Sequence, residues 1–402
     1  MASERRSAAS NALSDDIAGW LAREALGDSE PATLFEALCR RLRAAGVPIL
    51  RGNASFNVLH PLYHAGALTW TAEGVDVRLF TWTAATREDY LRSPLNHVIT
   101  HQLPLLRRRL TGRTALLDFP VLPELRDFGG HDYLVLLVPF AEDRSAAPGE
   151  RSGVICTWLG DRPSGFTDGE IRLLQRLTSR LVVALKGRLD RSIARNVASA
   201  YLGRHAGRAV LRGAIRRGDG EKLQAALWYS DLRHSSTLAD HDTAEGFLRV
   251  LNQYFEMTAG AIHDHGGEVV SFIGDAVLGF FRVEGAPEDA CGRAFAAAEE
   301  ARARLAAHEP EDGGTRIEFG IGLHLGEVIY GNVGVPERLQ FTLVGSAVNE
   351  TARIEDLTKT LERPVVASDV FARCVDRPWL SLGEHSLRGI KRPVEVFAPL
   401  AP

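Results

Sequence analysis

Two aspartates stand at positions where a protein could hold a divalent cation. Asp231 follows the apolar run Ala225–Tyr229, which we expect to be a strand, and Asp275 lies in the tight turn Ile273-Gly274-Asp275 between two further strand-like runs. If that hairpin lies beside the first strand, the two carboxylates offer a hard-oxygen site for Mg²⁺ or Mn²⁺, with triphosphate oxygens completing the shell. A Gly-Asp turn alone is more often just a turn, so its pairing with Asp231 is what favours a metal site.

An asparagine and an arginine form a second candidate pair. Asn349 and Arg353 are four residues apart, which puts both side chains on one face of a helix. The alternative is that Arg353 is a surface ion-pair partner of Glu350 or Glu355. The spacing by itself leaves both interpretations open.

The elements around these residues predict an α+β fold. An apolar strand at 225–229 is followed by an amphipathic helix at 243–265, a hairpin of two strands at 267–281, an Ala-rich helix at 290–307 and a strand at 319–325. This βαββαβ order is the ferredoxin-like arrangement. It supplies the adjacent strand ends that the two aspartates need.

From about Ala225 to Phe397 the chain resembles the class III adenylate/guanylate cyclase family. The segments that carry the resemblance are, in order, WYSDLR, HGGEVVSFIGDAVLGFF, GIGLHLGEVIYGNVG, QFTLVGSAVNETARIE and LRGIKRPVEVF. Any one of these motifs is weak evidence, but five in the family's order are a specific signal.

The resemblance implies a role for each candidate residue. Asp231 and Asp275, helped by the carbonyl of Leu232, would bind two divalent ions, Mg²⁺ or Mn²⁺. Asn349 would position the ribose, and Arg353 would stabilise the charge that develops at the α-phosphate. The implied reaction is in-line attack of the ribose 3′-oxygen on the α-phosphorus with loss of pyrophosphate, which depends on positioning and charge neutralisation.

Three further residues would bind the substrate. Arg388 would hold the terminal phosphates, and Ser271 and Thr342 would face the base. Many adenylate cyclases have a lysine at the position of Ser271, whereas Thr342 fits one adenylate-cyclase subgroup. Because a hydroxyl can donate or accept, the two residues could face adenine or guanine. ATP is the favoured substrate, with GTP or a pyrimidine triphosphate as the alternative.

One segment departs from the family. After the first aspartate the family usually has Gly-Phe-Thr, and this chain has His234-Ser235-Ser236. A small residue there lets backbone N–H groups approach phosphate. We expect the His234 side chain to point to solvent and the backbone path to be kept.

The resemblance also implies a homodimer. In this family the metal aspartates and the Asn/Arg pair of one site come from opposite subunits, and this chain carries each set once. Two equivalent shared sites would follow.

The first half of the chain predicts a separate α/β domain. Helices are expected within 15–45, and strands at 55–59, 67–71, 75–81, 115–118, 133–139 and 153–159. Thr167 and Glu170 form a capping box that opens a helix with an apolar stripe from Leu174 to Val197. The first part of that helix is expected on its own sheet and the second part against a partner helix.

The order of these elements resembles a GAF-type sensory domain. The predicted organisation is a disordered tail at 1–14, a GAF-like sensory domain with an unknown ligand at 15–190, a coupling helix and linker at 191–224, and a catalytic domain at 225–402. Sensor state would then regulate how the catalytic halves meet.

Composition limits the function classes. The 402 residues carry a net charge of −4, which gives no reason to expect a nucleic-acid partner; the basic run Arg107-Arg108-Arg109 is expected to be a solvated face. Four scattered cysteines without a CxxC pair fit a reducing cytosol. No apolar run approaches the length needed to cross a bilayer, so a soluble cytoplasmic protein is expected.

Three other functions compete with the cyclase interpretation. An inert ferredoxin-like interaction module has no need of both residue pairs. A diguanylate cyclase would carry a GGDEF-type signature, which is absent from the sequence. A DNA-binding regulator is disfavoured by the net acidity and by the lack of a helix-turn-helix pattern.

Overall fold

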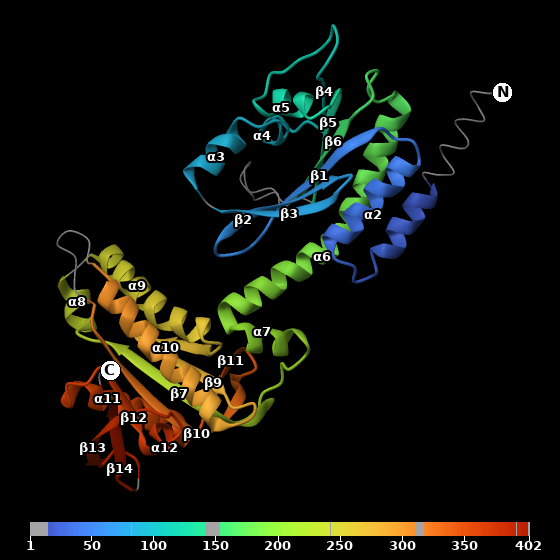
Figure 1. Cartoon of the computed structure of the whole chain (residues 1–402). Coiled ribbons are helices and arrows are strands. Elements are labelled where there is room, and N and C mark those ends of the chain that lie inside the picture. Colours follow the sequence, from blue (N-terminus) through green and yellow to red (C-terminus); the bar gives the residue numbers. More distant parts are fainter. Residues whose placement is uncertain are drawn as a thin grey trace. The chain divides into compact units, whose positions relative to one another are not determined.

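The computed structural model describes residues 15–81, 83–140, 153–241, 243–309, 317–390 and 392–400. Contacts divide the chain into two units, Met1–Val197 and Ala198–Pro402 (Figure 1). The predicted disordered tail, residues 1–14, lies outside the described residues.

The N-terminal unit is built on a six-stranded antiparallel sheet in the order β3-β2-β1-β6-β5-β4. Two helices and residues 15–24 cover one face, and short helices pack on the other. The strands are β1 (Ile49–Asn57), β2 (Tyr63–Thr71), β3 (Gly74–Thr81), β4 (Leu105–Arg109), β5 (Asp132–Pro139) and β6 (Gly153–Gly160). The helices are α2 (Pro31–Ala44), α3 (Ala84–Leu91), α4 (Pro94–Thr100), α5 (Val121–Asp127) and α6 (Asp168–Leu202).

The strand predicted at 115–118 is absent. The basic run Arg107-Arg108-Arg109 lies in β4 and its three residues are half-buried, so the prediction of a solvated face is wrong. The reason is a carboxylate that the local pattern does not reveal. Asp132 is fully buried; its Oδ2 lies 2.7 Å from Arg107 Nη2 and 3.5 Å from Arg109 Nη1. A buried charge persists only when it is paired, so two arginines are drawn into the sheet.

The predicted long helix is present as α6. Its capping box forms as expected: the Glu170 amide donates to Thr167 Oγ1 at 3.3 Å, and the Thr167 amide donates to Glu170 Oε2 at 2.7 Å. The stripe from Leu173 to Leu189 is buried against the sheet, whereas no described residue of α6 beyond Leu189 is buried. Pairing of this second part with a partner helix stays a prediction.

The C-terminal unit contains an eight-stranded sheet in the order β13-β14-β12-β10-β7-β9-β8, with β11 paired to β10. Within it, β7, α9, β8, β9, α10 and β10 follow one another as βαββαβ, which confirms the predicted ferredoxin-like order. The strands are β7 (Gly220–Leu232), β8 (Glu268–Ile273), β9 (Ala276–Arg282), β10 (Phe319–Val335), β11 (Arg338–Val344), β12 (Val365–Ser368), β13 (Trp379–His385) and β14 (Val394–Pro399). The helices are α7 (Arg204–Leu211), α8 (Ser235–His241), α9 (Ala244–Asp264), α10 (Pro287–Ala307), α11 (Ser346–Thr360) and α12 (Asp369–Ala372).

Helices cover both faces of this sheet. The two long amphipathic helices α9 and α10 lie together against one face, where an apolar core includes Trp228 and Phe281 (Figure 1). Helix α11 lies on the other face, directly over β10. Strand β7 begins at Gly220, five residues before the predicted strand, because Gly220 pairs with Gly331 of β10.

Glycines in β10 set how closely α11 approaches. A Cβ at Gly322 would lie 2.6 Å from the Glu355 backbone nitrogen and 2.7 Å from the Thr351 carbonyl oxygen. A Cβ at Gly320 would lie 2.1 Å from Thr358 Oγ1. Because neither glycine has a side chain, the helix packs directly on the strand, which fixes the side chains that α11 carries.

Candidate active site

The two predicted metal aspartates are neighbours at the end of the central strands. Asp231 is the penultimate residue of β7 and pairs in register with Ala276 of β9. Asp275 precedes Ala276 in the turn of the β8–β9 hairpin, where Gly274 adopts the left-handed conformation with φ 64°. The Asp275 carboxyl lies within hydrogen-bonding reach of Asp231, and the Leu232 amide donates to the Asp275 carbonyl at 3.4 Å.

A lysine that the sequence analysis missed contacts this pair. Lys359, in the last turn of α11, donates from Nζ to Asp231 Oδ2 at 2.6 Å. The two residues are 128 positions apart in the chain, so no local pattern connects them. The one sequence signal is that Lys359 follows the Asn349/Arg353 pair closely in the chain.

The carboxyl groups at this strand end have shifted pKa values. Burial raises the pKa of Asp231 above its ordinary value; the hydrogen bond from Lys359 opposes that rise and the neighbouring Asp275 adds to it. Burial also raises the pKa of Glu355 to about 7, against the opposing charge of Lys359. Glu355 is 1% exposed and accepts a hydrogen bond from Thr358 Oγ1 at 3.2 Å.

Asn349 and Arg353 both lie on α11 with exposed side chains. Arg353 forms an ion pair, but with Asp356, at 2.9 Å from Nη1 to Oδ2, rather than with Glu350 or Glu355. Both side chains of that pair are exposed, and such a surface pair contributes only about 0–1 kcal/mol. The pair therefore holds the guanidinium weakly.

The predicted substrate-binding residues lie on three different elements. Ser271 is half-buried on β8, and Thr342 is half-buried on β11, which contacts β8. Arg388 is exposed in the turn between β13 and β14, at the opposite edge of the sheet from β8. The structure thus brings the strands of Ser271 and Thr342 together and separates Arg388 from the β8–β9 hairpin within one chain.

His234 adopts the conformation that a glycine would take there. Its φ is 60° and its side chain is exposed. The next residues, Ser235–His241, form α8, and the Arg233 guanidinium donates to the Thr358 carbonyl at 3.1 Å. The exposed His234 side chain agrees with the expectation that it points to solvent; retention of the family's backbone path stays a prediction.

The donor set suits a hard divalent cation that a substrate helps to hold. Two carboxylates and the Leu232 carbonyl are oxygen donors of the kind that Mg²⁺ and Mn²⁺ prefer. In the part of the chain that the structure describes, no group of three or more His, Cys, Asp or Glu side chains could hold a metal by itself. A cation at Asp231 and Asp275 would need further oxygens, such as those of a triphosphate.

Comparison with known proteins identifies this region. Residues 220–389 match the family described as "Adenylate and Guanylate cyclase catalytic domain". Residues 220–389 are a class III adenylate/guanylate cyclase domain. The match starts at the first residue of β7, so the cyclase domain includes the end of the segment predicted as linker.

Relatives of this chain occur in mycobacteria. An uncharacterized protein of Mycobacterium tuberculosis (strain CDC 1551 / Oshkosh) is 34% identical over 244 residues, which are 58% of this chain and 41% of that protein. A second uncharacterized protein, from strain ATCC 25618 / H37Rv, is 33% identical over 246 residues, again 58% and 41%. The chain thus spans about two fifths of the length of these relatives.

Solved structures similar to this chain include two cyclases. One is a bacterial light-regulated adenylyl cyclase, 28% identical, with 44% of this chain and 91% of that chain covered and a TM-score of 0.40. The other is the guanylyl cyclase Cya2, 29% identical, with 45% and 93% covered and a TM-score of 0.41.

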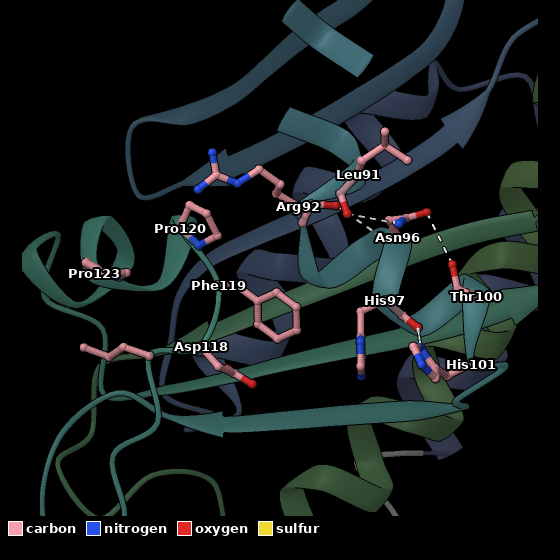
Figure 2. Close-up of a pocket in the computed structure, with 12 residues that line it drawn as sticks. Leu91, Arg92, Asn96, His97, Thr100, His101, Asp118, Phe119, Pro120 and Pro123 are labelled. Carbon is pink, nitrogen blue, oxygen red and sulfur yellow. Dashed lines mark hydrogen bonds between the residues drawn. The ribbon is translucent and has the colours of Figure 1, made fainter. Parts of the chain in front are cut away.

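The N-terminal unit has a separate pocket, of about 600 Å³ (Figure 2). The side chains of α4 and of the segment before α5 line it. His97 and His101 stack with ring centroids 4.2 Å apart, and Phe119 meets His97 edge-on at 5.4 Å. Asn96 and Asp118 add polar groups to its lining. Similarity to a GAF-type domain stays a prediction.

None of the helices that the structure describes is both long enough and apolar enough to span a membrane.

Proposed function

We propose that this chain is an adenylate cyclase, which converts ATP to 3′,5′-cyclic AMP and pyrophosphate in a homodimer regulated by its N-terminal unit. The observation that carries the proposal is the pair of carboxyls, Asp231 and Asp275, at adjacent strand ends of a class III cyclase domain. An inert module of this fold would have no need to keep two acidic groups within hydrogen-bonding reach, since like charges so close are unfavourable.

In this proposal Asp231, Asp275 and the Leu232 carbonyl hold two divalent cations, Mg²⁺ or Mn²⁺. These ions supply acidification of the ribose 3′-hydroxyl and charge neutralisation of the phosphates. Asn349 orients the ribose, and Arg353 binds the charge that grows on the α-phosphate oxygens. The weak Arg353–Asp356 pair supports this role, because the guanidinium can exchange a solvated carboxylate for phosphate.

The homodimer is supported by exposed apolar side chains near the hairpin. Phe272 and Ile273, beside Asp275, are 53% and 51% exposed, and Val333, Val335 and Val344 on β10 and β11 are also exposed. Strand β11 contacts β8, and exposed apolar side chains on neighbouring strands favour an interaction surface. A second copy covering them would bring its own Asn349 and Arg353 toward Asp231.

The choice of ATP is supported by Thr342, at a position where one subgroup of adenylate cyclases has threonine. Ser271 and Thr342 offer hydroxyls that can donate or accept, so GTP or a pyrimidine triphosphate is the alternative substrate. Arg388 would hold the terminal phosphates of any of them.

Regulation is proposed to arise from residues 15–190, with residues 191–224 coupling them to the catalytic domain at 225–402. The pocket beside His97 and Phe119 supports a small-molecule input. The second part of α6, which lacks buried residues, supports a helix that pairs with its copy.

The test is an assay of the purified full chain with Mn²⁺ and, separately, Mg²⁺. ATP, GTP, CTP and UTP are each offered, and mass spectrometry identifies the products beside an Asp231→Ala control. Cyclic AMP from the wild type alone is the expected result. A different cyclic nucleotide would overturn the base assignment, and no cyclic product from any triphosphate would favour the inert module.

A further inference from the structure

An ion pair with no role assigned so far joins Lys359 to a proposed metal ligand. Lys359 Nζ lies 2.6 Å from Asp231 Oδ2, with the lysine side chain 46% exposed and the aspartate 22% exposed. A charge-assisted bond of this length is among the stronger hydrogen bonds in proteins. The ammonium therefore lies at the carboxylate that a divalent cation would need.

The position of Lys359 does not depend on this bond. Helix α11 is fixed over β10 by the close approach at Gly320 and Gly322 and by the buried side chains of Ile354 and Thr358. Arg233 also ties the helix to the end of β7 through the Thr358 carbonyl. A substitution at Lys359 should thus leave the helix in place.

The charges around Asp231 explain why a cation is held there. Asp231 and Asp275 are within hydrogen-bonding reach of each other, and Glu355 is buried one helical turn before Lys359. Three acidic groups in one region repel one another when ionised. One ammonium offsets part of that repulsion, and a divalent cation would offset more of it.

We propose that Lys359 is a built-in counter-ion that occupies the cation position at Asp231 and that a divalent metal must displace. This inference rests on the proposed function, because it takes Asp231 as a metal ligand. The long, partly exposed lysine side chain can leave without moving the helix. Its competition weakens metal binding in the absence of nucleotide, so that metal and triphosphate are favoured to bind together.

The experiment measures Mn²⁺ binding to the full-length protein without nucleotide, by the loss of the free Mn²⁺ signal in electron paramagnetic resonance. Lys359→Gln should bind Mn²⁺ about fivefold more tightly than wild type, which corresponds to about 1 kcal/mol, the scale of a partly exposed ion pair. Lys359→Arg keeps the charge and should stay close to wild type. Thermal unfolding of each variant checks that it folds.

Two controls separate the possible failures. Lys222→Gln removes another lysine–carboxylate pair of the same unit, Lys222 with Glu327 at 2.8 Å, and should leave Mn²⁺ binding unchanged. Asp231→Asn should abolish the tightened binding when combined with Lys359→Gln. If Asp231-dependent binding exists but Lys359→Gln binds no more tightly than wild type, the counter-ion inference is wrong. If no variant shows Asp231-dependent binding, the proposed metal site itself fails.

Discussion

Glu355 is a buried carboxyl whose ionisation should set part of the pH dependence of folding. Burial raises its folded-state pKa to about 7, whereas an unfolded chain has the ordinary value of about 4.3. The folded state therefore binds this proton more tightly than the unfolded state does. Linkage then makes the Glu355 contribution to stability fall as pH rises from about 4.3 to 7, with no penalty below that window.

The prediction concerns Glu355→Gln, which keeps an acceptor for the Thr358 hydroxyl but cannot ionise. Its melting temperature relative to wild type should rise as the pH increases from about 4.3 to 7 and then level off. Differential scanning calorimetry at several pH values measures this. Asp356→Asn, an exposed neighbour on the same helix, is the matched control. A constant difference across the window would contradict the buried, protonated form.

At the scale of single residues, the sequence was informative where chemistry depends on a local motif. Asp231 and Asp275 each end or join strands that their own flanking residues predict, so their meeting could be expected. Lys359 could not, because its partner lies far away in the chain and a lysine near a helix C-terminus is usual. Asp132 was missed for the same reason: only the folded sheet brings two arginines to it.

At the scale of elements, Gly322 sets how closely α11 packs on β10. Gly322→Ala places a methyl group against the backbone of Thr351 and Glu355, which cannot give way as a flexible side chain could. We expect a loss of about 1–3 kcal/mol in the free energy of unfolding, the usual cost of overpacking. Activity should fall as well, because α11 carries Asn349 and Arg353.

The matched control is Gly292→Ala in α10, where an added Cβ would meet nothing within 4 Å. Alanine is the better helix former by about 1 kcal/mol, so this variant should be as stable as wild type or more so. Chemical denaturation compares the two variants. Equal stability of Gly322→Ala and wild type would show that α11 can move away from β10 at little cost.

The elements themselves were predictable where hydrophobic period and turn chemistry agreed. The βαββαβ order and α6 with its capping box have clear local signals, and both are present. Strand β4 was missed because its three consecutive arginines lack the alternation of apolar and polar residues that predicts a strand, although it pairs with β5. The start of β7 was missed because Gly220 is a poor strand former that pairs only by close approach to Gly331.

At the scale of the whole molecule, the proposed shared site predicts that two inactive variants restore activity when they form a mixed dimer. Asp231→Ala and Arg353→Ala should each be inactive alone, because every site in either homodimer lacks one residue. In a mixed dimer one site carries both substitutions and the other carries neither. Mixed dimers, purified after co-expression with a different affinity tag on each chain, should therefore have about half of the wild-type activity, since one of their two sites is intact.

The control for this experiment is a mixed dimer of Asp231→Ala with Asp275→Ala, two substitutions in the same half of the site. That dimer should remain inactive, because each of its sites loses one of the two carboxylates. It is co-expressed and purified with the same two tags. If the Asp231→Ala and Arg353→Ala mixed dimer is also inactive although both chains are folded, the catalytic residues do not come from opposite subunits. The proposed homodimeric mechanism would then be wrong even if the wild type makes cyclic AMP.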